Sequence, residues 1–108
     1  MKSVKMKEKL EKELDLASWS VLHPHFVRNS LYLVDDSLDF IEVCTAVALN
    51  KTKKVDEWIQ KKLVCRPDGH YVEKWHKEKP VFKCLIVSPH VFIQKTDILL
   101  AIKEAKRQ

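Results

Sequence analysis

Residues 31–43, LYLVDDSLDFIEV, carry the most informative local signals in the chain. The apolar run at residues 30–34 is rich in β-forming side chains and stops at two acidic residues, which predicts a short strand. Asp39 then precedes a helical apolar pattern, and Glu42 follows three residues later, as in a capping box. The stretch therefore predicts a strand, a short turn and then a deeply buried helix over residues 40–49.

The segment before this stretch predicts one long helix and a bend. Apolar residues recur over residues 4–22 at steps of three or four, which is the period of one helix face. This stripe consists of Met6, Leu10, Leu14, Ala17 and Val21. Pro24 cannot donate a backbone hydrogen bond, so we expect the long helix to end near His23. A short helical turn then runs to Asn29.

A second helix is expected immediately after residues 40–49. Asn50 can adopt the left-handed conformation that ends a helix, and Thr52 can cap the next one. The apolar stripe of this next helix consists of Val55, Trp58, Ile59 and Leu63. Two helices joined by about three residues resemble a helix-turn-helix.

The remaining elements are shorter. The run at residues 63–66 predicts a strand, and a short helix follows Gly69, with an apolar side formed by Tyr71, Val72 and Trp75. Residues 81–93 are largely apolar and predict a central strand interrupted at Pro89. Thr96 is expected to cap a C-terminal helix.

Together these elements predict an α+β domain. We expect three to four helices packed on a small three-stranded, largely antiparallel sheet, with a helix-turn-helix and a winged-helix-like order. The strands of this sheet would be residues 30–34, 63–66 and 81–93.

Composition limits the class of protein. At 108 residues, with 45% hydrophobic and 32% charged side chains, the chain is typical of a single globular domain spanning residues 1–108. No apolar run approaches the roughly 20 residues that span a bilayer. The first residues alternate in charge where a secretory signal would have an apolar core. The three cysteines are odd in number and widely spaced, which favours reduced thiols and a cytoplasmic location.

Four stretches of the chain together resemble one bacterial family. They are ASWSVLHPHF (17–26), LYLVDDSLDFIEV (31–43), VDEW (55–58) and LIVSPHVFIQ (85–94). On these motifs, residues from about 15–94 resemble the domain-of-unknown-function 2288 family, while residues 95–108 would add the C-terminal helix. The resemblance implies a compact cytosolic bacterial protein, and it implies no activity because the family is uncharacterised.

Positive charge is concentrated in the middle of the chain. Residues 51–83 carry 10 basic and 5 acidic side chains, which suggests a polyanion as partner. Candidate nucleic-acid contacts are Lys51, Lys53, Lys54, Lys61, Lys62 and Arg66. However, Asp56 and Glu57 share the exposed arc of this helix and would repel phosphate. A solvated helix face is therefore the preferred interpretation, and nucleic-acid binding through residues 51–66 is the alternative.

Catalytic and metal-binding motifs are missing from the sequence. The single glycine excludes a glycine-rich phosphate loop, and neither a serine nucleophile elbow nor a zinc-protease motif occurs. The candidate metal or thiol-pair residues lack paired zinc-ligand spacing, although they could still meet in space; they are His23, His25, Cys65, His70 and His76. We therefore predict no enzyme activity, no cofactor and no bound metal.

The expected function is a non-catalytic binding or regulatory module with an unknown ligand. Tyr71 and Trp75 lie on a short helix and could form an exposed aromatic patch that contacts a protein partner or a second copy in a homodimer. No feature of the sequence predicts contact with a membrane.

Overall fold

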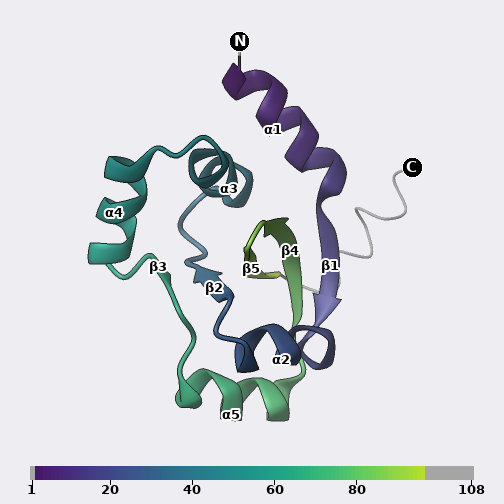
Figure 1. Cartoon of the computed structure of the whole chain (residues 1–108). Helices are drawn as coiled ribbons and strands as arrows, with labels where there is room; N and C mark the ends of the chain where they lie inside the picture. The colour runs from purple at the N-terminus through teal and green to yellow at the C-terminus, as the bar shows by residue number, and fades with distance from the viewer. Residues whose placement is uncertain (1, 97–108) are drawn as a thin grey trace.

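A five-stranded sheet runs through the middle of the molecule (Figure 1). The computed structural model describes residues 2–96. Its strands are β1 (Asp15–Ser18), β2 (Leu31–Val34), β3 (Val64–Cys65), β4 (Val81–Val87) and β5 (His90–Thr96). Their spatial order is β1-β4-β5-β2-β3, with β2 parallel to β5 and the other neighbours antiparallel.

Five helices within residues 2–96 pack around this sheet. They are α1 (Lys2–Glu13), α2 (Trp19–Val27), α3 (Phe40–Ala48), α4 (Thr52–Gln60) and α5 (Gly69–Glu78). The α+β class is confirmed, but the predicted three to four helices on a three-stranded, largely antiparallel sheet are wrong. A mixed sheet with helices on both faces also replaces the predicted winged-helix-like order. The expected pair of consecutive helices is present as α3 and α4, which are joined by three residues.

Strand residues alternate between two hydrophobic cores, one on each face of the sheet. Phe92 of β5 faces the first core, while its neighbours Val91 and Ile93 face the second. Helices α1 and α3 cover the first core through Leu10, Phe40, Val43 and Cys44. Helices α2 and α5 cover the second core through Trp19, Leu22 and Trp75. The molecule therefore has three layers, and α2 and α5 lie together on one side of the sheet (Figure 1).

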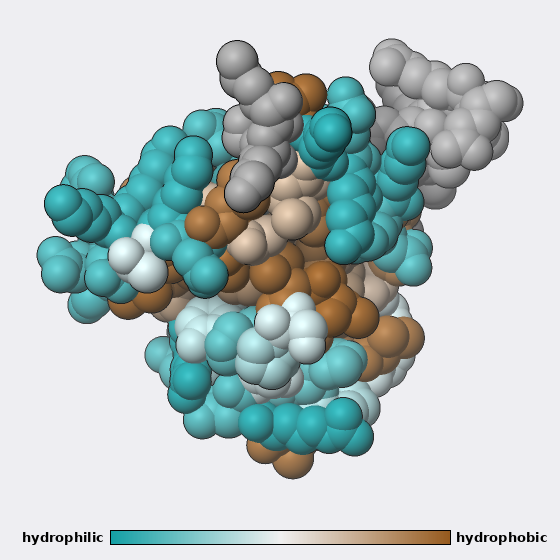
Figure 2. Space-filling view, turned by 45° about the horizontal axis from the view of Figure 1, so that its top comes forward, coloured by the Kyte–Doolittle hydropathy of each residue, from teal (hydrophilic) through white to brown (hydrophobic). Residues whose placement is uncertain are grey.

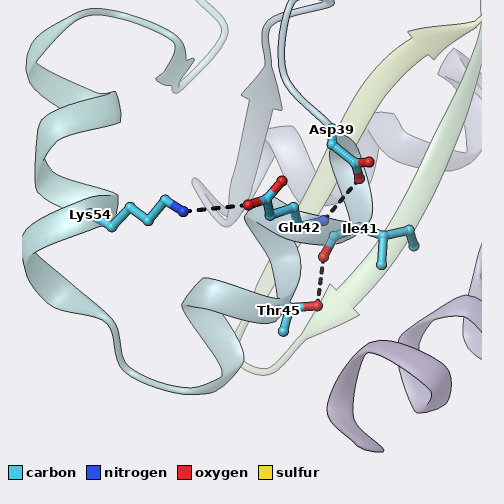
Figure 3. Close-up of polar contacts among 5 residues, drawn as sticks. All are labelled: Asp39, Ile41, Glu42, Thr45 and Lys54. Carbon is cyan, nitrogen blue, oxygen red and sulfur yellow. Dashed lines mark hydrogen bonds and ion pairs between the residues drawn. The ribbon is translucent and has the colours of Figure 1, made fainter. Parts of the chain in front are cut away.

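The start of α3 follows the sequence prediction in part. Asp39 Oδ1 accepts a hydrogen bond of 3.0 Å from the Glu42 backbone N–H, so Asp39 is the N-cap (Figure 3). The Glu42 carboxylate does not complete the capping box, since it accepts from Lys54 Nζ at 3.4 Å. The two predicted helix-ending residues, Asn29 and Asn50, do adopt left-handed φ angles of 64° and 56°.

The single helix predicted for residues 4–22 is wrong. The chain leaves α1 after Glu13 and forms β1, whose four residues pair with β4 from Val81 to Cys84. Pairing with a strand more than 60 residues away cannot be inferred from a local helical period. In this pairing Ala17 lies opposite Phe82. Pro24 then lies inside α2 instead of separating two helices.

Three other predicted details differ from the structure. Residues 81–93 form two strands of a hairpin that turns at Ser88-Pro89, because an antiparallel return leaves both strands with hydrogen-bonding partners. Lys51, not Thr52, is the N-cap of α4, and it makes no side-chain capping bond. Thr96 is the last residue of β5, and the rest of the predicted C-terminal helix lies outside the described residues.

Candidate ligand cavity between α2 and α5

Two lysines in or next to α4, Lys54 and Lys61, are paired with acidic side chains. Lys54 Nζ lies 3.4 Å from a Glu42 oxygen and 5.4 Å from the centre of the Trp58 ring. Lys61 Nζ lies 2.9 Å from a Glu57 oxygen one helical turn away. Because these pairs are on the surface, they contribute little to stability, but they partly neutralise the charge that a phosphate would meet.

The other predicted nucleic-acid contacts do not gather on one surface. Lys51 lines a pocket together with Lys54 and Glu42, whereas Lys62 lines a different cleft beside β2. Arg66 donates from Nη2 to the Tyr32 hydroxyl at 3.2 Å, and Lys53 is simply exposed. Figure 2 shows hydrophilic residues over the side of the molecule that α4 forms. The structure therefore does not assemble the six cations into a single site.

Helix α4 is also less buried than its apolar stripe predicted. None of its residues is fully buried, Trp58 is half-buried, and Ile59 is 45% exposed. The helix lies at one side of the sheet next to β3 and α3 (Figure 1). Its buried-stripe prediction was therefore wrong in degree, since only one side of α4 has neighbours to pack against.

A cleft between β2 and α5, called the β2–α5 cleft, has mixed charge. It has a volume of about 260 Å³ and is lined by Leu33, Val34, Asp35, Asp36, Lys62, Leu63, Cys65, Tyr71, Lys74, Trp75 and Lys95. Hydrogen bonds from the side chain and backbone of Ser37 lower the pKa of Asp35, which favours its ionised form. Lys95 is paired with Glu78 at 3.4 Å. Acids and bases thus offset one another here.

Cys65 in this cleft lacks the environment of a catalytic thiol. Burial, followed by the charges of Asp68 and Asp35, raises its pKa. A raised pKa reduces the thiolate fraction, and the thiolate is the nucleophilic form. Burial raises the pKa of Cys44 to about 12, which keeps that thiol protonated at neutral pH.

The structure brings together only some of the predicted histidines and aromatic residues. His23 of α2 and His76 of α5 lie with their ring centroids 5.9 Å apart, although they are far apart in sequence. Within residues 2–96, no three His, Cys, Asp or Glu side chains are close enough to hold a metal ion together. Trp75 is 3% exposed and belongs to the core, so Tyr71 is the half-exposed member of the predicted interface pair.

A second hollow, called the α2–α5 cavity, lies beside this histidine pair. Its volume is about 470 Å³, and its lining residues are Ser18, Trp19, Ser20, His23, His76 and Lys79. Small-molecule sites commonly enclose about 300–1,000 Å³. The Trp19 ring at this cavity packs into the core: its centroid lies 4.9 Å from that of Trp75, which in turn lies 4.9 Å from that of Phe82 in β4.

One residue that lines the α2–α5 cavity, Trp19, has a buried donor without an acceptor. Trp19 is 4% exposed, and its buried indole Nε1–H has no hydrogen-bond partner. Leaving such a group unsatisfied costs about 1–3 kcal/mol. The N-cap of α2, Ser18, makes no capping bond, because its Oγ lies 3.0 Å from Ser20 Oγ. The first turn of α2 therefore begins without a side-chain acceptor for its N–H groups.

No ligand cavity was predicted here from the sequence. Neither the start of α2 at Trp19 nor the approach of His76 to His23 could be inferred from local spacing. The available signal was the stretch ASWSVLHPHF (17–26), which has an aromatic ring, two hydroxyls and two imidazoles in ten residues.

The family model for proteins of unknown function, DUF2288, matches residues 5–95. The chain belongs to the DUF2288 family. An NMR solution structure of PA1075 from Pseudomonas aeruginosa is similar to this DUF2288 member, with a TM-score of 0.75 and 29% sequence identity, and the match covers 86% of each chain. No curated protein matches the present chain significantly.

Neither the family match nor the match to PA1075 identifies a ligand, activity or partner. Within residues 2–96, no helix is both long enough and apolar enough to cross a membrane. The α2–α5 cavity is therefore the feature of this DUF2288 protein whose geometry says most about function.

Proposed function

We propose that this DUF2288 protein is a cytosolic, non-catalytic binding module and that the α2–α5 cavity is its ligand site. One observation carries the proposal, namely the buried Trp19 Nε1–H without an acceptor in the wall of a cavity large enough for a small molecule. Folded proteins satisfy nearly all of their buried donors, so an orphan donor at a cavity suggests a missing acceptor.

The chemistry of the cavity supports binding more than catalysis. A catalytic centre needs a nucleophile or base held by an orienting partner. No hydrogen bond among the described residues joins His23 or His76 to a carboxylate or hydroxyl, and the cysteines with raised pKa values lie outside this cavity. The proposed role of the site is therefore to recognise a ligand.

Nucleic-acid binding through residues 51–66 has weaker support. Three of its six candidate cations make contacts within the protein, and Lys51 and Lys62 line different hollows. Electrostatic binding to a polyanion requires cations that reach successive phosphates from one surface.

The proposed ligand site can be tested by NMR with isotope-labelled protein. The probes are benzoate, phenyl phosphate, benzamide and benzylamine, each titrated to millimolar concentration. At least one probe should give saturable shifts of the Trp19 indole signal and of the Ser20 and His76 amides. If none of the four moves these signals, the proposed ligand site is wrong.

A blocking variant and a matched control make this test specific. Ser20 is exposed and lines the cavity, so Ser20→Phe should fill it and abolish the shifts. Val21 is the next residue of the same helix, is 61% exposed and does not line the cavity. Val21→Phe should leave binding intact, and equal loss in both variants would contradict the assignment.

Self-association is a separate proposal, supported by the edge position of β1. Leu16 of this strand is 45% exposed, and an exposed edge strand can pair with a second copy. Light scattering should give a dimer mass that Leu16→Lys reduces to a monomer. A monomer mass for the unmodified protein at high concentration would contradict this proposal.

A further inference from the structure

We infer that the α2–α5 cavity binds the anionic group of its ligand, a carboxylate or a phosphate. This inference rests on the proposed function, because it assigns a ligand class to the same cavity. Three independent features of the described residues support it: the charge of the lining, the start of α2 and the orphan indole donor.

The lining of the α2–α5 cavity carries positive charge and no negative side chain. Lys79 supplies an ammonium group, and His23 and His76 supply two imidazoles, while Asp and Glu are missing from the lining. Four other hollows in residues 2–96 each contain at least one carboxylate. The nearest acid in sequence, Glu78, is paired with Lys95 at 3.4 Å.

The start of α2 also supports the binding of an anionic group. This helix has nine residues, and its first two, Trp19 and Ser20, line the cavity together with the N-cap Ser18. A helix N-terminus carries partial positive charge and N–H groups that bind anions. At α3 and α5 that role is filled by the Asp39 and Asp68 carboxylates, whereas α2 has no side-chain cap.

The Trp19 indole N–H is a third feature, because this donor has no hydrogen-bond acceptor. Its Nε1 is buried and has no hydrogen-bond partner. The rings of His23 and His76 lie with their centroids 5.7 Å and 6.1 Å from that of the indole, and their planes are nearly perpendicular to the indole plane, at 81° and 80°. His76 is exposed, so its ring can move aside at low cost when a ligand enters. A carboxylate or phosphate oxygen is an acceptor without a proton of its own, which suits a site built from donors.

The matched probes test this inference separately from the proposed function. Benzoate and benzamide have nearly the same shape, but only benzoate is charged. We expect benzoate or phenyl phosphate to shift the Trp19 indole signal saturably and benzamide to bind at least about tenfold more weakly. Preference for phenyl phosphate assigns a phosphate ligand, and preference for benzoate assigns a carboxylate.

Two contrary outcomes have different meanings. If benzamide or benzylamine binds as tightly as the anions, the anion inference is overturned while the ligand site survives. If no probe shifts the cavity signals, both the inference and the proposed function are overturned.

Capping variants of α2 provide an internal check that does not depend on the shape of a probe. Ser18→Asp places a carboxylate at the N-cap, where it should both raise the melting temperature and abolish anion binding. Ser18→Asn can form the same cap without charge, so it should retain more anion affinity than Ser18→Asp. Equal anion affinity in Ser18→Asp and in the unmodified protein would contradict the inference.

Removal of the cavity lysine gives the matched charge control. Lys79→Gln should weaken benzoate or phenyl phosphate binding by roughly three- to tenfold, since it removes a charged partner at the site. Lys77→Gln makes the same charge change two residues earlier, at a position that does not line the cavity, and should have little effect. Equal weakening by both variants would indicate a general charge effect and overturn the assignment of Lys79.

Discussion

Helices α2 and α4 both begin without a side-chain cap, but the charged groups around them differ. Around α4, the lysines find acidic partners in Glu42 and Glu57, and no residue of the helix is fully buried. The cavity at the start of α2 is lined by Lys79, two histidines, two serines and Trp19, and its lining contains no acidic side chain. The comparison teaches that lysines close together in sequence do not by themselves form a binding surface. Hydrogen-bond donors and a positive charge that line one cavity without an acidic side chain are a better indication of one.

The largest expected effect separates the two helices by their contribution to the core. Trp19→Ala should lower the free energy of unfolding by about 3–5 kcal/mol, because it empties a buried aromatic cluster. Trp58→Ala in α4 should cost about 1–2 kcal/mol, because that ring is only half-buried. Urea denaturation measures both values. Equal losses would show that α4 is as much a part of the core as α2.

Local signals predicted the elements with short-range causes. The cap at Asp39, the turns at Asn29 and Asn50, and the strand at residues 30–34 all depend on chemistry within a few residues. The α+β class and the family resemblance over about residues 15–94 followed from the same kind of pattern, and the family is confirmed.

The features that the sequence did not reveal depend on distant segments. Strand β1 exists because it pairs with β4, and the α2–α5 cavity exists because His76 and Lys79 are brought to the start of α2. His76 and Lys79 lie more than 50 residues from Trp19 in the sequence, so no local period or motif could predict that the three residues line one cavity. For the same reason, the sequence left open whether the basic residues of 51–66 share one surface, and in the structure Lys51 and Lys62 line different hollows.

The next effect tests whether the start of α2 is truly uncapped. Asp39→Ala should destabilise the protein by about 1 kcal/mol, because it removes the cap of α3. Ser18→Ala should cost only a few tenths of that, since the Ser18 hydroxyl bonds to Ser20 and not to the helix. If both substitutions cost the same in urea denaturation, the first N–H groups of α2 already have a cap.

A third prediction tests the surface of α4 directly. Labelled duplex DNA and single-stranded RNA should show no saturable binding at low salt, because the candidate cations are divided among separate surroundings. The triple charge reversal Lys53→Glu, Lys54→Glu and Lys61→Glu should therefore change nothing measurable in this assay. Binding that weakens steeply with salt and disappears in the triple variant would establish the nucleic-acid alternative.

The smallest expected effect concerns the ion pair between Lys61 and Glu57. The hydrogen bond from Lys61, and then its charge, lower the pKa of Glu57. A depressed carboxyl pKa means that the pair stabilises the fold above the pKa of the unfolded state and that this contribution is lost as pH falls through the folded-state pKa. NMR titration of the Glu57 carboxyl should show a higher pKa in Lys61→Met. An unchanged pKa would mean that the pair does not persist in solution.

The central claim is that this DUF2288 protein recognises its ligand at the α2–α5 cavity and not along α4. The most direct measurement is a pair of NMR titrations of the same isotope-labelled sample, one with phenyl phosphate and benzoate and one with a short DNA duplex. We predict that the small anions shift the Trp19 indole and the Ser20 and His76 amides, while the duplex leaves the amides of α4 unmoved. Shifts along α4 with DNA, together with a silent Trp19 indole in both titrations, would contradict the claim.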